Sequence, residues 1–196
     1  TLIFDEMITG VRSDKNSVQK KYNIKPDITT IGKIIGGGMP VGVIGISKSV
    51  YRKIKKKRIF YGGTFSGNSL SSFVGNETLK YLMKNKKIIQ KINEKSKYFQ
   101  DNLNRYIFHN KMDLKIYRYS SILRIVYTKK KIDNRTQRDF FEHKVSKKID
   151  NFKKFLFQKK IYYPSSGIIF FSNATSYKNI NYLIKIIKIG FKKNFK

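Results

Sequence analysis

The chain has 196 residues, 40% of them hydrophobic, which is enough for one ordinary domain or two small lobes and excludes wholesale disorder. It contains no cysteine, which excludes disulfides, thiolate metal sites and a cysteine nucleophile. No apolar run reaches the roughly 18–20 residues that span a bilayer, and the first residues lack the basic-then-apolar order of a signal peptide. We therefore expect a soluble, cytoplasmic protein.

The formal net charge of +31 comes from 43 basic and 12 acidic residues, and taken alone it predicts attraction to nucleic acid or to an anionic membrane. Only eight of the basic residues are arginine, and the 35 lysines are spread over many segments together with the Ile, Asn, Tyr and Phe that AT-rich codons supply. Nucleic-acid readers favour arginine for bidentate contacts. Drift in composition therefore explains the charge better than nucleic-acid binding does.

The first half of the chain alternates short apolar runs with turns. Residues 1–8 predict a buried parallel strand with Asp5 and Glu6 near its end. Residues 28–31 and 41–46 predict two further strands, and Lys33 follows the first of these just before a glycine triplet. A lysine is thus held between a strand and a glycine-rich turn.

The second half predicts helices and an α+β arrangement. Apolar residues recur at helical intervals from about Ser69 to Tyr106, which predicts one long helix that links two lobes. The remaining expected elements are strands at 115–119 and 122–128, a helix at 138–159, a strand at 168–172 and a final helix at 177–191.

Three features point to chemistry: the carboxylates at a strand end, the lysine before the glycines, and the turn Gly63–Asn68, which contains Thr64. Each alone also fits a cap, a surface charge or a backbone requirement. Together they match a cofactor site, because a shielded lysine beside a carboxylate can act as a Schiff-base nucleophile, and an aspartate at a strand end can keep a pyridinium nitrogen protonated. A threonine hydroxyl among backbone N–H groups suits a phosphate.

The order of these motifs closely resembles that of the class III pyridoxal-phosphate aminotransferases, with the glutamate-1-semialdehyde aminomutase branch nearest. The resemblance is carried by Leu2–Arg12, Pro26–Gly42 and Gly63–Asn68. The tail, Ile161–Ser165 followed by Phe171–Thr175 and a closing helix, resembles the end of that family's small domain. The resemblance therefore covers nearly the whole chain, and its most specific motifs lie in the first 70 residues.

The resemblance implies an α/β chain with the PLP-dependent transferase fold type I. Residues 1–96 would be the C-terminal part of the large cofactor-binding domain, including the start of the linking helix. Residues 97–196 would form the small C-terminal α+β domain. The implied activity is amino transfer between a small amino compound and an aldehyde or ketone, with pyridoxal 5'-phosphate as cofactor.

Carried over position by position, the resemblance implies that Lys33 is the Schiff-base lysine and the catalytic proton shuttle. Asp5 would pair with the pyridine nitrogen, and Met7 stands where the family has a residue that packs on the ring. Thr64 matches the threonine that reaches the cofactor phosphate of the neighbouring subunit, so the implied assembly is a homodimer with the site at its interface.

The chain departs from the family pattern in two respects. The family's phosphate-binding loop and its stacking aromatic residue precede the strand at which this sequence begins. We therefore expect one of three situations: the sequence is a piece of a longer protein, a second polypeptide supplies the missing half of the site, or the protein has lost catalysis. Ile168 stands where the aminomutase branch has a glutamate, which makes a nucleotide-sugar or polyketide-type aminotransferase an alternative. The other alternative is a basic, non-catalytic binding module that reuses the fold to hold nucleic acid or an acidic partner. His109 and His143 are too far apart in sequence to predict a metal site.

Overall fold

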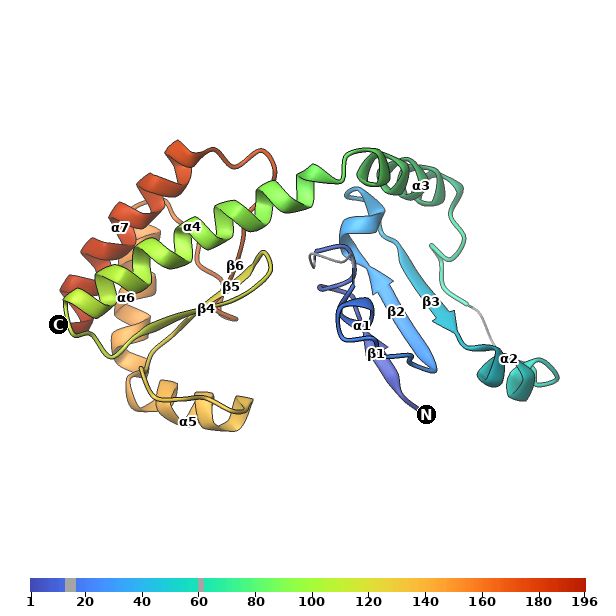
Figure 1. Cartoon of the computed structure of the whole chain (residues 1–196), viewed down its shortest axis with the longest axis horizontal. Coiled ribbons are helices and arrows are strands. Elements are labelled where there is room, and N and C mark those ends of the chain that lie inside the picture. The colour runs from blue at the N-terminus through green and yellow to red at the C-terminus, as the bar shows by residue number, and fades with distance from the viewer. Residues whose placement is uncertain (13–16, 60–61) are drawn as a thin grey trace. The chain divides into compact units, whose positions relative to one another are not determined.

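The computed structural model describes residues 1–12, 17–59 and 62–196, and its contacts divide the chain into two compact units. The first unit is Thr1–Gln90 and the second is Lys91–Lys196. The boundary falls inside helix α4 (Lys87–His109), the longest helix in Figure 1.

The first unit is built on a three-stranded sheet in the order β1-β2-β3. Strands β1 and β2 run parallel, with Asp5 beside Thr30, whereas β3 is antiparallel to β2. The elements in chain order are β1 (Ile3–Asp5), α1 (Val18–Lys21), β2 (Ile28–Gly32), the short 3-10 helix η1 (Lys33–Gly36), β3 (Gly42–Ile46), α2 (Lys48–Ile54) and α3 (Ser69–Lys84).

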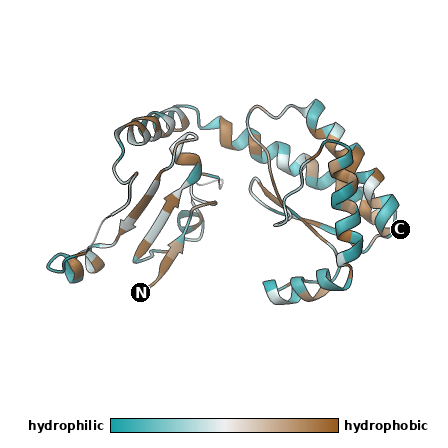
Figure 2. Cartoon of the chain, turned by 180° about the vertical axis from the view of Figure 1, so that it is seen from behind, coloured by the Kyte–Doolittle hydropathy of each residue, from teal (hydrophilic) through white to brown (hydrophobic). Residues whose placement is uncertain are grey.

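The outer strands of this sheet keep apolar side chains exposed. Ile3 in β1 and Ile44 in β3 are 59% and 70% exposed, and Figure 2 shows hydrophobic colouring along the strands of this unit. The expectation of a buried strand over residues 1–8 is therefore wrong: β1 has three residues and is an edge strand, with β2 as its neighbour. Strands of this composition are normally covered on both faces.

Helix α3 packs against η1 through glycine. A Cβ on Gly75 would lie 3.2 Å from the carbonyl oxygen of Ile35, so the close approach of the two elements depends on the missing side chain. The expected single helix from 69 to 106 is wrong in one respect, because it is interrupted after Lys84. The side-chain amide of Asn85 donates to the carbonyl of Tyr81 (2.9 Å) and helps to end α3.

The second unit has its own antiparallel sheet, in the order β4-β5-β6, and a core of helices. Its largest fully buried side chains include Phe99, Phe152 and Phe191, which come from α4, α6 and α7. The elements after α4 are β4 (Lys115–Tyr119), β5 (Ile122–Val126), α5 (Arg135–Lys144), α6 (Ser146–Gln158), β6 (Ile168–Phe170) and α7 (Tyr177–Phe195). The expected helix at 138–159 is in fact two, separated at Val145, whose φ of −120° is not helical.

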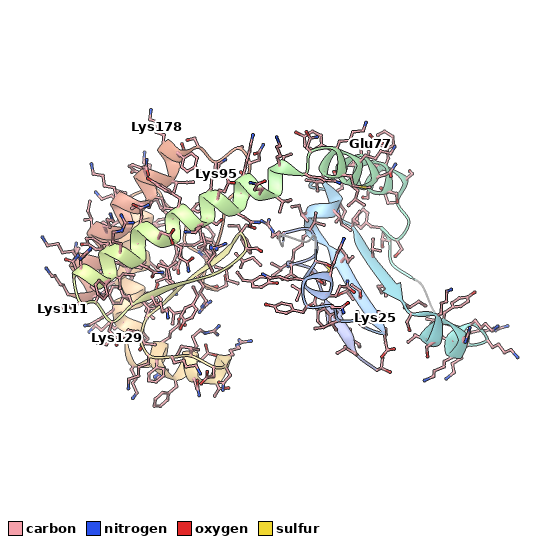
Figure 3. The ribbon with its side chains drawn as sticks, viewed as in Figure 1. Lys25, Glu77, Lys95, Lys111, Lys129 and Lys178 are labelled. Atoms are coloured by element: carbon pink, nitrogen blue, oxygen red, sulfur yellow. The ribbon has the colours of Figure 1, made fainter. Side chains whose placement is uncertain are left out.

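Lysine side chains are spread over the surfaces of both units. Lys111 and Lys178, for example, extend away from the ribbon in Figure 3. Among the described helices, none combines the length and the apolar character that crossing a bilayer requires.

Candidate functional site

The carboxyl ends of β1 and β2 bring Asp5 and Lys33 to the same edge of the first sheet. Asp5 ends β1 and pairs with Thr30, and Lys33 immediately follows Gly32, the last residue of β2. Because the two strands are parallel, their carboxyl ends lie at the same edge of the sheet. The structure therefore brings together the two residues on which the predicted cofactor site depends.

The Asp5 carboxylate is held in one orientation. Its Oδ1 accepts a hydrogen bond from the backbone N–H of Met7 (2.9 Å) and another from the hydroxyl of Thr30 (3.2 Å). Within residues 1–12, 17–59 and 62–196, no group donates to Asp5 Oδ2. One carboxylate oxygen is thus fixed and the other is available to a ligand.

Lys33 has an unusual backbone conformation and an exposed side chain. Its φ of 56° lies in the left-handed region, which costs free energy for a residue with a Cβ. The expectation that its amine is shielded from solvent is wrong for the described chain, because Lys33 is exposed. Its position at the sheet edge, however, is as expected from the sequence.

Met7 lies against the glycine that precedes Lys33. A Cβ on Gly32 would meet the Cε of Met7 and would lie 2.9 Å from its Sδ, so the thioether fills the space that a side chain at position 32 would take. Gly32 is itself buried. The predicted ring-packing residue is therefore next to the predicted Schiff-base lysine.

Glu6 has a different role from Asp5, which the sequence did not reveal. It is 1% exposed, and its carboxylate accepts hydrogen bonds from the hydroxyl of Thr9 (2.6 Å) and from the backbone N–H groups of Val18 (3.1 Å) and Gln19 (2.9 Å). It therefore caps the first turn of α1. Successive residues of a strand point to opposite faces, and this alternation is the signal that could have separated the two acids.

Thr64 is not brought to Asp5, Met7 and Lys33. It is exposed and lies in the turn before α3, where it lines a groove of about 1000 Å³ between β3 and α3. None of the other three predicted site residues lines this groove. Asn68, which also lines it, caps α3 by accepting from the N–H of Ser71 (2.9 Å).

The remaining residues singled out in the sequence lie in the second unit. Ile168 is the first residue of β6 and pairs with Arg124 of β5. His109 ends α4, where its ring packs on Phe108, and His143 lies in α5 beside a small cavity. Across the described ranges, no cluster of three or more histidine or acidic side chains could hold a metal ion.

Sequence comparison with known proteins gives the same family from a family model and from individual relatives. The family model described as aminotransferase class-III matches residues 1–130. The glutamate-1-semialdehyde 2,1-aminomutase of Thermosipho africanus is 35% identical over 185 residues, or 91% of this chain and 42% of that protein. The enzyme of the same name from Thermosipho melanesiensis is 34% identical over 205 residues, or 100% of this chain and 45% of that protein. The chain thus spans less than half the length of these relatives.

Solved structures share the fold at low sequence identity. A β-phenylalanine aminotransferase from Variovorax paradoxus has a TM-score of 0.85 at 19% identity, covering 98% of this chain and 44% of that one. A glutamate-1-semialdehyde aminomutase variant from Pseudomonas aeruginosa, in complex with PMP, has a TM-score of 0.82 at 14% identity, with coverage of 98% and 44%. The expected α/β fold of the PLP-dependent transferases is confirmed.

Proposed function

Because the chain belongs to the class-III aminotransferase family, as its motifs predicted, we propose that it holds pyridoxal phosphate at the sheet edge where Asp5 and Lys33 meet and catalyses amino-group transfer. One observation carries this proposal. Asp5 is the last residue of β1 and Lys33 directly follows β2, which is parallel to β1, so a carboxylate and an amine lie at the same edge of the sheet. The substrate would be a small amino compound together with an aldehyde or ketone.

The residues at this edge fit the cofactor chemically. A protonated pyridine nitrogen needs an anionic acceptor, and Asp5 offers an oxygen that no described residue uses. The exposed amine of Lys33 is accessible to an aldehyde. The polarizable side chain of Met7, seated over Gly32, supplies an apolar surface for one face of an aromatic ring.

Bound pyridoxal phosphate supplies an aldehyde that reacts with amines and a ring that stabilises the charge left by proton removal. Lys33 would anchor the cofactor through Nζ and, when free, take a proton from the substrate and return it at the same atom. Asp5 would keep the ring nitrogen protonated by ion pairing, and Met7 would orient the ring by packing. The family resemblance implies these three roles, and the positions of Asp5, Met7 and Lys33 at the end of β1 and β2 support them.

We further propose that two copies of the chain pair across the groove that contains Thr64. The proposal is supported by exposed apolar side chains along this part of the first unit, where Phe65 and Phe73 are both 65% exposed. In such a pair Thr64 would bind the phosphate of the cofactor held by the other copy. Sedimentation velocity tests the pairing: Phe73→Asp is expected to shift the protein toward a monomer, and an unchanged dimer would contradict the proposal.

The relatives are named aminomutases, which favours exchange of an amino group within one molecule. Ile168 favours a second candidate, a nucleotide-sugar or other small-molecule aminotransferase, because an apolar side chain cannot pair with a substrate ammonium there. A substrate screen with glutamate-1-semialdehyde against other amino donors and acceptors separates the two.

Spectroscopy of the cofactor tests the central assignment. The chain has 35 lysines, and any of them can react weakly with an aldehyde, so the test must locate the reacting amine. We expect a visible absorption band on adding pyridoxal phosphate, and borohydride reduction followed by peptide mapping should place the label on Lys33. Lys33→Ala should abolish the band, whereas Lys25→Ala, which removes another exposed lysine of the first unit, should keep it. A band that survives Lys33→Ala would refute the role of Lys33.

A further inference from the structure

One threonine stands out on the face of the first sheet that carries Asp5. In the strand register, Asp5 of β1 lies beside Thr30 of β2, and Thr30 lies beside Ile44 of β3. Side chains alternate between the two faces of a sheet, so Ile3 and Ile28 share this face. The other strand residues on it are likewise isoleucine or glycine. Thr30 therefore places a hydroxyl among aliphatic side chains, directly beside the carboxylate.

The strand itself does not require a hydroxyl at position 30. Valine has the same branching at Cβ as threonine and favours strands as well. What the hydroxyl adds is a hydrogen bond, because Thr30 Oγ1 donates to Asp5 Oδ1 (3.2 Å). The same oxygen accepts from the backbone N–H of Met7 (2.9 Å). Among residues 1–12, 17–59 and 62–196, Thr30 is thus the one side chain that donates to Asp5.

The preceding threonine of β2 has a different partner. Thr29 lies on the opposite face of the sheet, and its hydroxyl donates to Gln19 Oε1 (3.4 Å). Gln19 belongs to α1, whose first turn is capped by Glu6 on the same side. Two adjacent threonines therefore serve two faces: the Thr29 hydroxyl contacts α1, and the Thr30 hydroxyl contacts Asp5. This difference makes Thr29 a matched reference for the effect of Thr30.

Two donors restrict the Asp5 carboxylate more than one donor can. The backbone N–H of Met7 alone fixes the position of Oδ1, and the carboxylate can still turn about that contact. The Thr30 hydroxyl approaches the same oxygen from the neighbouring strand and limits this rotation. A group that is oriented before its ligand arrives loses less conformational freedom on binding. The pair of donors therefore prepares Oδ2 for a ligand.

We propose that Thr30 is a positioning residue for the cofactor: its hydroxyl holds the Asp5 carboxylate so that Oδ2 is presented to the protonated ring nitrogen of pyridoxal phosphate. This inference rests on the proposed function and assigns to it a residue that acts through Asp5. The effect of losing the hydroxyl should be modest for two reasons. Met7 keeps its own hydrogen bond to Asp5, and the distance from Thr30 is longer than the usual value of about 2.7–2.8 Å between two oxygens.

Titration with pyridoxal phosphate, followed by its visible absorption band, compares three variants with the wild type. Thr30→Val should weaken cofactor binding about two- to tenfold, the range expected for one hydrogen bond. Thr30→Ser keeps the hydroxyl and should retain wild-type affinity. Thr29→Val removes the hydroxyl on the opposite face and is the matched control, so it should also bind as the wild type does. Wild-type affinity in Thr30→Val, or an equal loss in Thr30→Ser or Thr29→Val, would overturn the proposal.

The cofactor-free protein supplies a second measurement, which does not depend on the reaction at Lys33. Three-bond couplings between Hα and Hβ of Asp5 report whether its side chain keeps one rotamer. We expect one rotamer in the wild type and in Thr29→Val, and averaging between rotamers in Thr30→Val. Unchanged couplings in Thr30→Val would overturn the proposal. A wild-type protein that shows no band with pyridoxal phosphate would refute the proposed function and this role with it, whereas a normal band that Thr30→Val leaves unchanged would refute the role of Thr30 alone.

Discussion

The two units of this chain carry similar small sheets but bury very different amounts of apolar surface. Among the described residues, Ile35 is the one apolar side chain of the first unit that is buried, whereas the second unit buries many, which come from its helices and its sheet and lie between Ile92 and Phe191 in the sequence. The second unit therefore has its own hydrophobic core. The first unit presents apolar strands, glycine turns and a strained lysine, which are features of a site that needs further surfaces around it.

The largest effect is expected when the two units are produced as separate polypeptides and their folding is compared. Residues 87–196, which keep α4 whole, should fold with a cooperative thermal transition followed by circular dichroism. Residues 1–86 alone should show no such transition and should bind a hydrophobic dye, because burial of apolar area is the main favourable term in folding. A cooperative transition in residues 1–86 would break the comparison.

Within the second unit, a core substitution should be far more costly than a surface one on the same helix. Phe152 is fully buried in α6 and its ring packs on that of Phe191 (centroids 5.2 Å apart), whereas Phe157 in the same helix is 74% exposed. Phe152→Ala should lower the free energy of unfolding by about 3–5 kcal/mol. Phe157→Ala should change it by less than about 0.5 kcal/mol. Urea denaturation of residues 87–196 measures both, and equal losses would show that α6 does not pack as described.

The neighbouring residues Asp5 and Glu6 should differ in role: Glu6 should matter for the stability of the first unit and Asp5 for cofactor binding. The buried Glu6 carboxylate accepts three hydrogen bonds. Glu6→Gln replaces one of its oxygens by an NH2 group, which cannot accept from these donors, and should destabilise the unit by about 1–3 kcal/mol. Asp5→Asn keeps an oxygen for Met7 and Thr30, so stability should change little while affinity for pyridoxal phosphate falls. Thermal melts and cofactor titration of the two variants make the comparison. A larger loss of stability in Asp5→Asn would reverse these roles.

The sequence predicts well what depends on local pattern. The order of Asp5, Lys33 and Thr64 within specific motifs indicated the family, and apolar periodicity placed the closing helix, α7, at its correct start. The helix ends at Asn85 and Val145 were missed because apolar residues continue at helical spacing across both. Periodicity does not report where the backbone is interrupted.

Burial and long-range clusters could not be predicted in the same way. The exposure of Ile3 and Lys33 depends on which surfaces cover the first sheet, and a strand's composition does not specify them. The ion pair between Arg124 and Glu142 joins β5 to α5 with no recognisable spacing in the sequence. Such a contact becomes visible only when the tertiary structure of the second unit is known.

The smallest expected effect is an alkaline loss of stability confined to the second unit. Burial, partly offset by the neighbouring Tyr127 and Arg124, raises the pKa of Tyr163 to about 12, and burial also raises the pKa of Tyr127 well above its usual value. The unfolded chain releases these protons near pH 10, whereas the folded unit retains them. Their contribution is therefore complete below about pH 10 and is lost as the pH rises toward about 12.

For Tyr163 the free energy of unfolding should fall by at most about 1.4 kcal/mol per pH unit in this window. Tyr163→Phe also removes a hydrogen bond to the Gly167 carbonyl (3.1 Å), so its stability should be lower at neutral pH but should decline less steeply. The two proteins differ only in this hydroxyl, so the difference in slope isolates the tyrosine. Urea denaturation of residues 87–196 between about pH 9 and about pH 11 measures it, and parallel curves would mean that the Tyr163 hydroxyl is not held in its neutral form by the fold.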